Sequence, residues 1–179
     1  MSTPPVYTVP EGTLPLLGGI LKMLDFAHQN MIQIIADLPD EALVWQPAND
    51  MGSLSGIICH MMYCETYAIR LAAGEDVSYD GEKDDAENDG STWRTAEGRE
   101  ALIARIAEGD AIMKRILPVM TVAGMGERRP AWGAGALSSG GELIAKAATH
   151  TTMHWGHLQM TRQRWEQAHP EFRGSYTPW

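Results

Sequence analysis

The sequence predicts an all-α protein that folds as a four-helix bundle. Three long stretches, 13–38, 53–73 and 95–118, repeat apolar residues every three or four positions, which is the period of one helix face. A fourth stretch, 139–168, has the same period and carries three histidines. Polar or glycine-rich segments separate these stretches, and no convincing strand pattern or internal repeat interrupts them. Four amphipathic helices of this kind bury their apolar faces against one another.

The first helix is expected to begin near Thr13, with Pro15 in its first turn, where proline is well tolerated. Leu38-Pro39 is expected to end it, because a residue before proline disfavours the helical conformation. His28 is predicted at the edge of the apolar face, as an ordinary boundary residue. The predicted core positions are Leu17, Ile20, Leu21, Leu24, Ala27, Met31, Ile34, Ile35 and Leu38.

The second helix is expected to follow a plain connection over residues 39–51. Ser53 is predicted to cap it, and it extends to about Ala73, with Gly74 as the left-handed stop. Glu65 is expected to point away from the buried side. The predicted inward stripe contains one imidazole and consists of Ile57, His60, Met61, Cys64, Ala68 and Leu71.

The third helix is predicted between two long links. The acidic segment 74–91 before it is expected to be a solvated loop, because its carboxylates lack the spacing of an EF-hand. Thr95 is predicted to cap the third helix, which ends near Pro118. A glycine-rich link of about twenty residues then precedes the last helix, and links of this length in a compact domain often serve a function. Trp132 in this link is predicted to cover a pocket.

The last helix is expected to start with a capping box formed by Ser139 and Glu142 and to extend to about Ala168. At about 100° per residue, His150 and His154 lie about 40° apart around the helix. His157 returns to within about 20° of His150, so all three face the core. Burying an imidazole in that position costs free energy unless the ring is hydrogen-bonded, bound to a metal or facing a wet pocket.

The histidines predict a metal site that draws on two helices. A pair at i and i+4, such as His150 and His154, can present two nitrogens to one ion. His60, which faces inward on the second helix, supplies the third ligand that such a site needs. Cys64 lies one turn beyond His60 and is interpreted as a small buried hydrophobe in preference to a ligand.

Composition limits the classes of partner. A net charge of −9 disfavours nucleic acid and anionic membranes as partners. No apolar run is long enough to span a membrane, and the N-terminus lacks the features of a secretory signal. Cys59 and Cys64 point about 140° apart on one helix and cannot bridge each other. We therefore expect a cytoplasmic protein of one domain, 1–179, with its core over about 13–168, that acts on a small molecule.

Two segments of the chain resemble the DinB/YfiT-like superfamily of four-helix-bundle metalloproteins. They are LPDEALVWQPANDMGSLSGIICHM and PAWGAGALSSGGELIAKAATHTTMHWGHL. The resemblance implies an up-down-down-up bundle with a long link before the last helix, and a metal triad formed by His60, His150 and His154. His157 departs from the family pattern, which commonly has an amide residue there. Sulfoxide-synthase relatives carry His-x-x-x-His-x-Glu, and Gly156 replaces that glutamate here.

Members of the superfamily include thiol transferases that act with low-molecular-weight bacterial thiols, and a thiol-dependent isomerase. Three protein ligands leave an open coordination position, as in catalytic zinc sites. Zinc or nickel is the expected ion, with iron and manganese as alternatives that also suit imidazole. The predicted function is metal-dependent S-transfer from a thiol such as bacillithiol or mycothiol to an electrophile. Metal-dependent hydrolysis and a non-catalytic metal- or ligand-binding bundle are the alternatives.

The remaining site predictions concern the walls of the pocket and the assembly. His157 is predicted to be a catalytic proton carrier, with direct ligation or orientation of a ligand as alternatives. Trp45, Trp132 and Tyr67 are predicted to contact the bound thiol or substrate. Because bundles often bury an exposed helix face in a twofold dimer, a homodimer is expected.

Overall fold

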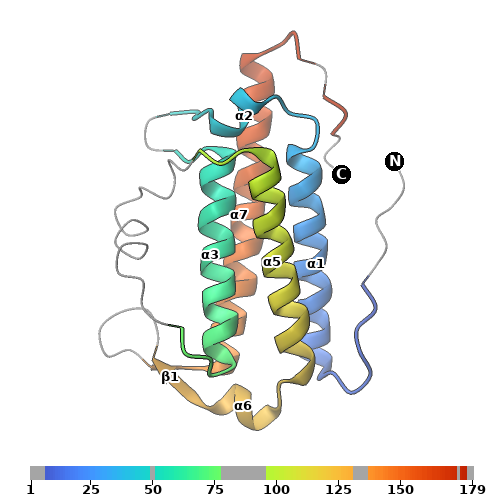
Figure 1. The fold of residues 1–179 in the computed structure, drawn as a ribbon, viewed down its shortest axis with the longest axis vertical. Helices are drawn as coiled ribbons and strands as arrows, with labels where there is room; N and C mark the ends of the chain where they lie inside the picture. The colour runs from blue at the N-terminus through green and yellow to red at the C-terminus, as the bar shows by residue number, and fades with distance from the viewer. Residues whose placement is uncertain (1–6, 49–50, 78–95, 131–136, 173, 177–179) are drawn as a thin grey trace.

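The computed structural model shows a bundle of four long helices, as predicted (Figure 1). They are α1 (Pro15–Ile35), α3 (Leu54–Ala72), α5 (Arg99–Ile116) and α7 (Gly140–Ala168). The structure describes residues 7–48, 51–77, 96–130, 137–172 and 174–176. The predicted cap Thr95, the predicted pocket residue Trp132 and most of the acidic segment therefore lie outside the described residues.

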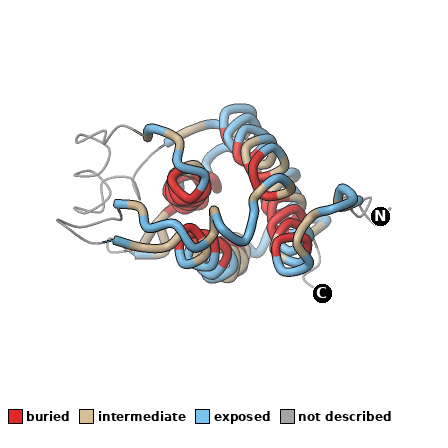
Figure 2. The backbone as a smooth tube through the Cα atoms, turned by 90° about the horizontal axis from the view of Figure 1, so that it is seen from below, coloured by how far each residue is buried: buried red, intermediate tan, exposed pale blue. Residues whose placement is uncertain are grey.

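The helices form a square in which each packs on two neighbours, in the order α1, α5, α3, α7. α1 and α7 run in one direction and α3 and α5 in the other, which is the up-down-down-up order (Figure 1). α3 and α5 are therefore parallel neighbours. Seen from below, the buried parts of the helices face one another (Figure 2).

The first helix ends earlier than predicted. α1 stops at Ile35, and a short helix, α2 (Asp40–Val44), occupies part of the segment expected to be a plain connection. Arg99 satisfies two carbonyls at this end, because its guanidinium donates to the carbonyl of Ile35 over 3.1 Å and also to that of Leu38. These carbonyls are thus paired by a side chain from α5, a contact between distant segments that no local pattern reveals.

The predicted caps of the second and fourth helices are confirmed. Ser53 Oγ accepts from the backbone N–H of Gly56 over 3.0 Å, and Gly74 ends α3 with a φ of 77°. Ser139 Oγ accepts from the N–H of Glu142 over 3.2 Å, and the Ser139 N–H donates to the Glu142 carboxylate over 2.6 Å. Both helices therefore begin where local side chains satisfy their first N–H groups.

The link before α7 contains more structure than predicted. It comprises η2 (Leu117–Val119), α6 (Val122–Gly126), and two short strands, β1 (Arg128–Pro130) and β2 (Leu137–Ser139), which pair antiparallel. The expectation of no strand is wrong here, because three-residue strands are too short to show alternation. Gly140 joins this sheet to α7, and a Cβ there would lie 2.8 Å from the Gly124 carbonyl oxygen, so only glycine fits without a shift.

The apolar stripes form a core in two clusters, one in each half of the bundle. All of the core positions predicted for the first helix are buried except Ile20, which is half-buried. Every predicted member of the α3 stripe is also buried. Among the described residues, no helix is sufficiently long and apolar to cross a membrane.

A buried polar cluster joins all four helices at one level. His28 of α1 was expected at a boundary, but it is only 2% exposed. Its Nε2 lies 3.0 Å from an oxygen of Glu65 on α3, and its Nδ1 lies 3.5 Å from Asp110 on α5. Thr151 of α7 donates to the other Glu65 oxygen over 2.6 Å. Glu65 is fully buried, so the expectation that it points outward is wrong.

The carboxylates keep His28 protonated. Burial lowers the pKa of this imidazole, but attraction by Glu65, together with hydrogen bonds to Asp110 and Glu65, outweighs burial and raises the pKa to about 9. A charged histidine at this depth is tolerated because both ring nitrogens face carboxylates.

We expect the free energy of unfolding to decrease as the pH rises from about 6.5 to about 9. The folded pKa of His28 lies above the unfolded value of about 6.5, so its stabilisation is complete below 6.5 and is lost as the pH passes the folded pKa. Urea denaturation of the wild type and His28→Gln across this range measures the difference. Groups common to both proteins cancel, and equal slopes in the two proteins would contradict this assignment.

Candidate metal centre

Two antiparallel neighbours, α3 and α7, bring three of the predicted site histidines together. His60 comes from the inward stripe of α3, and His150 and His154 lie one turn apart on α7. His60 is 7% exposed and His154 4%, whereas His150 is half-buried. Two imidazoles are thus withdrawn from solvent, and the third lies between them and the surface.

The imidazoles converge through the same type of nitrogen. His60 Nε2 lies 3.0 Å from His150 Nε2, and His154 Nε2 lies 3.1 Å from the same atom. A neutral imidazole has one N–H and one lone pair, so the single Nε2 of His150 cannot make a good hydrogen bond with both neighbours at once. A shared cation would satisfy all three lone pairs.

The distances fit a bound transition-metal ion. Two nitrogens that each lie about 2.0–2.1 Å from one ion, at tetrahedral or octahedral angles, are about 2.8–3.4 Å apart. The two separations that involve His150, 3.0 and 3.1 Å, fall within this interval. The donor set is suitable as well, because neutral imidazole is a ligand for zinc, nickel and iron.

The surroundings keep these histidines neutral. Burial, with a smaller contribution from the neighbouring imidazoles, lowers the pKa of His60, His150 and His154 to about 4 each. Lys146 adds to this effect at His150. At neutral pH the three rings therefore carry lone pairs without first having to lose a proton, which is the form that binds metal.

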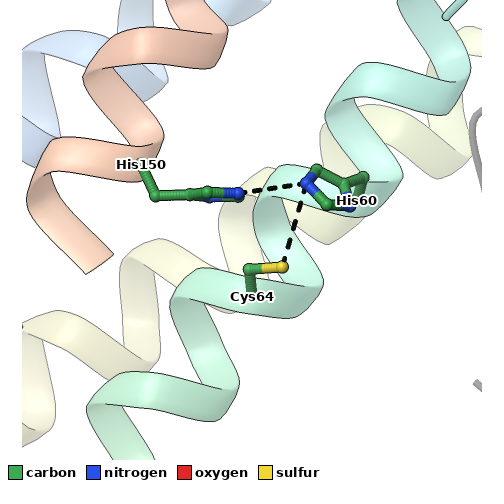
Figure 3. Close-up of side chains that lie close together, drawn as sticks. All are labelled: His60, Cys64 and His150. Carbon is green, nitrogen blue, oxygen red and sulfur yellow. Dashed lines mark hydrogen bonds between the residues drawn. The ribbon is translucent and has the colours of Figure 1, made fainter. Parts of the chain in front are cut away.

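Cys64 lies closer to this cluster than the sequence analysis assumed. Ligand atoms of His60, Cys64 and His150 all lie within 4.8 Å of one another, and Figure 3 shows the thiol pointing toward His60. The Sγ atom is 4.0 Å from His60 Nε2. A sulfur and a nitrogen on one zinc ion would be about 3.1–3.6 Å apart, so the thiol needs a shift that the imidazoles do not.

His157 contacts the cluster from its outer side. This residue is exposed, and its Nδ1 lies 3.1 Å from Nδ1 of His154. His154 therefore faces His150 with one ring nitrogen and His157 with the other. Ligand histidines commonly donate their second N–H to a partner that fixes the orientation of the ring. His157 occupies the position of such a partner, which was one of the alternatives that the sequence left open.

Of the aromatic residues predicted to line the pocket, Trp45 lies away from the cluster. Trp45 contacts His169, with ring centroids 6.3 Å apart, and His169 follows the end of α7, so the structure does not bring Trp45 to the histidine cluster. Tyr67 is half-buried beside Tyr63, with centroids 6.2 Å apart. Trp132 lies outside the described residues.

A pocket of about 400 Å³ opens at the exposed side of the cluster. Its described lining comes from successive turns of α7 and consists of Ala145, Lys146, Thr149, His150 and Met153. Lys146 was not among the predicted site residues, although its position four residues before His150 places it on the same helix face. A search for charged residues at i±4 from each predicted ligand would have found it.

The sequence profile of the DinB superfamily matches residues 23–158. No match was found among curated proteins. Solved structures share the fold, two of them at 14% sequence identity, which shows likeness of the fold alone.

One of these structures is a conserved protein from Enterococcus faecalis, with a TM-score of 0.68 over 84% of this chain and 97% of that protein. The other is YfiT from Bacillus subtilis, with a TM-score of 0.66 over 89% of this chain and 93% of YfiT. YfiT is described as a probable metal-dependent hydrolase with an unusual four-helix bundle topology.

We expect His154→Ala to lose metal binding and Cys64→Ser to retain it. Cobalt loading measures both, because a cobalt–thiolate bond gives a charge-transfer band that imidazole ligands do not. The wild type and Cys64→Ser should have the same spectrum, and His169→Ala serves as a control histidine outside the cluster. A thiolate band in the wild type that Cys64→Ser removes would show instead that the thiol is a ligand.

For His157→Ala we expect full occupancy at saturating metal but an affinity lower by about 10–100-fold, the usual effect of removing a residue that orients a ligand. His157→Asn should restore part of the loss, because its amide oxygen can accept from His154 Nδ1–H. Competition against a chromophoric chelator measures the affinity. Complete loss of metal in His157→Ala would indicate direct ligation, and an unchanged affinity would exclude an orienting role.

Proposed function

Because this chain belongs to the DinB superfamily, we propose that it is a metal-dependent enzyme in which His60, His150 and His154 hold one divalent ion. The observation behind the proposal is that Nε2 of His150 lies 3.0 Å from Nε2 of His60 and 3.1 Å from Nε2 of His154. Zinc or nickel suits this ligand set best, with iron or manganese as alternatives. Three protein ligands leave room for a water or a substrate, which distinguishes catalytic from structural sites.

The ligand set favours activation of a nucleophile. An ion held by neutral imidazoles keeps its full charge, and such an ion lowers the pKa of a bound water or thiol toward neutrality. The chain contributes the orientation of His154, through His157, and the partly dry surroundings of His60. The half-buried position of His150 and the pocket beside it give a small molecule access to the centre.

Hydrolysis is the first candidate reaction, with water as the nucleophile. Its support is the description of YfiT, which has the same fold, as a probable metal-dependent hydrolase. Thiol S-transfer is the second candidate and uses the same centre, with a low-molecular-weight thiol such as bacillithiol or mycothiol in place of water. Its support is the resemblance of the two histidine-bearing segments to the thiol transferases of the superfamily.

The two reactions differ in the mass of their products. Protein loaded with zinc or nickel is incubated with a panel of esters, amides and alkylating electrophiles, with and without thiol, and the products are identified by mass spectrometry. We expect activity in the wild type, loss with chelator and loss in His154→Ala. Products that gain water indicate hydrolysis, whereas products that gain the thiol indicate S-transfer. Stoichiometric metal with no turnover across the panel would instead support a non-catalytic binding bundle.

A further inference from the structure

The site histidines are not held equally by their surroundings. His157 faces the second ring nitrogen of His154, whereas Nδ1 of His150 is buried and has no hydrogen-bond partner among the described residues. A ligand histidine commonly donates its second N–H to a group that fixes the orientation of the ring. The place of His150 in the cluster therefore depends on where the backbone of α7 lies against α3.

The cluster tolerates only a small displacement of α7. Two nitrogens on one ion are about 2.8–3.4 Å apart, so the permitted range is about 0.6 Å. Sliding α7 along α3 by the rise of a single residue moves His150 by about 1.5 Å. Apolar side chains are buried on the neighbouring turns of α7, among them Ala147, Ala148 and Leu158. Because the hydrophobic effect is non-directional, a directional contact between α3 and α7 sets their relative level more sharply.

Thr151, the residue after His150, makes such a contact. Its hydroxyl donates to an oxygen of Glu65 over 2.6 Å, and both residues are fully buried. Hydrogen bonds to a carboxylate are short and about twice as strong as those between neutral groups. Glu65 lies five residues beyond His60, or about 7.5 Å along α3. The contact therefore joins the same two stretches of helix that carry the site histidines.

Glu65 is itself held in place from the other side of the bundle. Its second oxygen lies 3.0 Å from Nε2 of His28 on α1, and Nδ1 of His28 lies 3.5 Å from Asp110 on α5. Removing the Thr151 hydroxyl therefore leaves the Glu65 carboxylate paired with His28. A substitution at Thr151 thus tests the position of α7 without leaving an unpaired charge in the core.

We propose that Thr151, through its hydrogen bond to Glu65, is a positioning residue that places His150 in the metal centre. This inference rests on the proposed function, because it assumes an ion at the three site histidines. Thr151 acts through the stretch of backbone that it shares with His150, while Glu65 engages its hydroxyl in the core.

Two substitutions separate the hydroxyl of Thr151 from its methyl group. Thr151→Val keeps the shape and loses the donor, whereas Thr151→Ser keeps the donor and loses the methyl group. Competition against a chromophoric chelator measures the affinity of each variant for cobalt. We expect Thr151→Val to bind cobalt about tenfold more weakly than the wild type, at the lower end of the cost of removing a group that supports a ligand, and Thr151→Ser to stay close to the wild type. A side chain that served packing alone would give the opposite order.

The visible spectrum of the cobalt-saturated protein reports the geometry of the ligands. We expect a shifted band in Thr151→Val and the wild-type band in Thr151→Ser, because a displaced His150 changes the ligand field of the ion. A loss of folding stability that leaves the site intact does not change this spectrum. Thr161→Val makes the same substitution at another buried position of α7, about 15 Å farther along, and should keep both the affinity and the spectrum of the wild type. If Thr151→Val does not fold, Thr151→Ala and Thr151→Ser give the same comparison, because they differ only in the hydroxyl.

The outcomes separate this role from the metal centre itself. If the wild type does not bind cobalt, the proposed metal centre is wrong and the positioning role falls with it. If the wild type and all of the Thr151 variants bind cobalt with one affinity and one spectrum, only the positioning role is wrong. An equal loss in Thr151→Val and Thr151→Ser would assign the effect to packing and would also overturn the role of the hydroxyl.

Discussion

The contact between Glu65 and Thr151 determines how α3 and α7 are aligned, and the histidine cluster depends on that alignment. Thr151 directly follows His150, and its hydroxyl donates to a carboxylate that is fully buried. A buried carboxylate must keep its partners, because an unpaired charge in the interior is very costly. Sliding one helix along the other would break this hydrogen bond and separate His60 from His150 at the same time.

An ion pair formed by a buried arginine also holds α7 nearer its C-terminal end. Arg162 is fully buried, and its guanidinium donates to Asp37 over 2.7 Å and to the carbonyl of Ile34 over 2.5 Å. Tyr176 covers it, with the ring centroid 4.8 Å from the guanidinium carbon. His154 and His157 thus lie on a part of α7 that is fixed at both sides. A site on rigid elements needs little reorganisation when it binds a ligand.

Histidines of one bundle acquire different charge states from their surroundings. His28 faces carboxylates, which raise its pKa to about 9, whereas the site histidines face one another, and their pKa values are lowered to about 4. Burial alone disfavours the charged form in both places, so the partner decides the outcome. The same fold therefore holds His28 as a buried cation and keeps the site histidines of α3 and α7 as neutral ligands.

The sequence by itself determined the four helices and most of their caps, because apolar periodicity and capping residues are local features. It also identified the three histidines that converge, because imidazoles at helical spacing can be recognised within a single helix. Only the tertiary structure decided that His28 and Glu65 are buried partners, that Cys64 borders the cluster, that Trp45 lies elsewhere, and that Lys146 shares a pocket with His150. Each of these depends on which faces meet or stay open when the helices pack. His28 and Glu65, for example, are 37 positions apart. Such contacts follow from the order in which the helices pack, and residue spacing within one helix carries no information about that order.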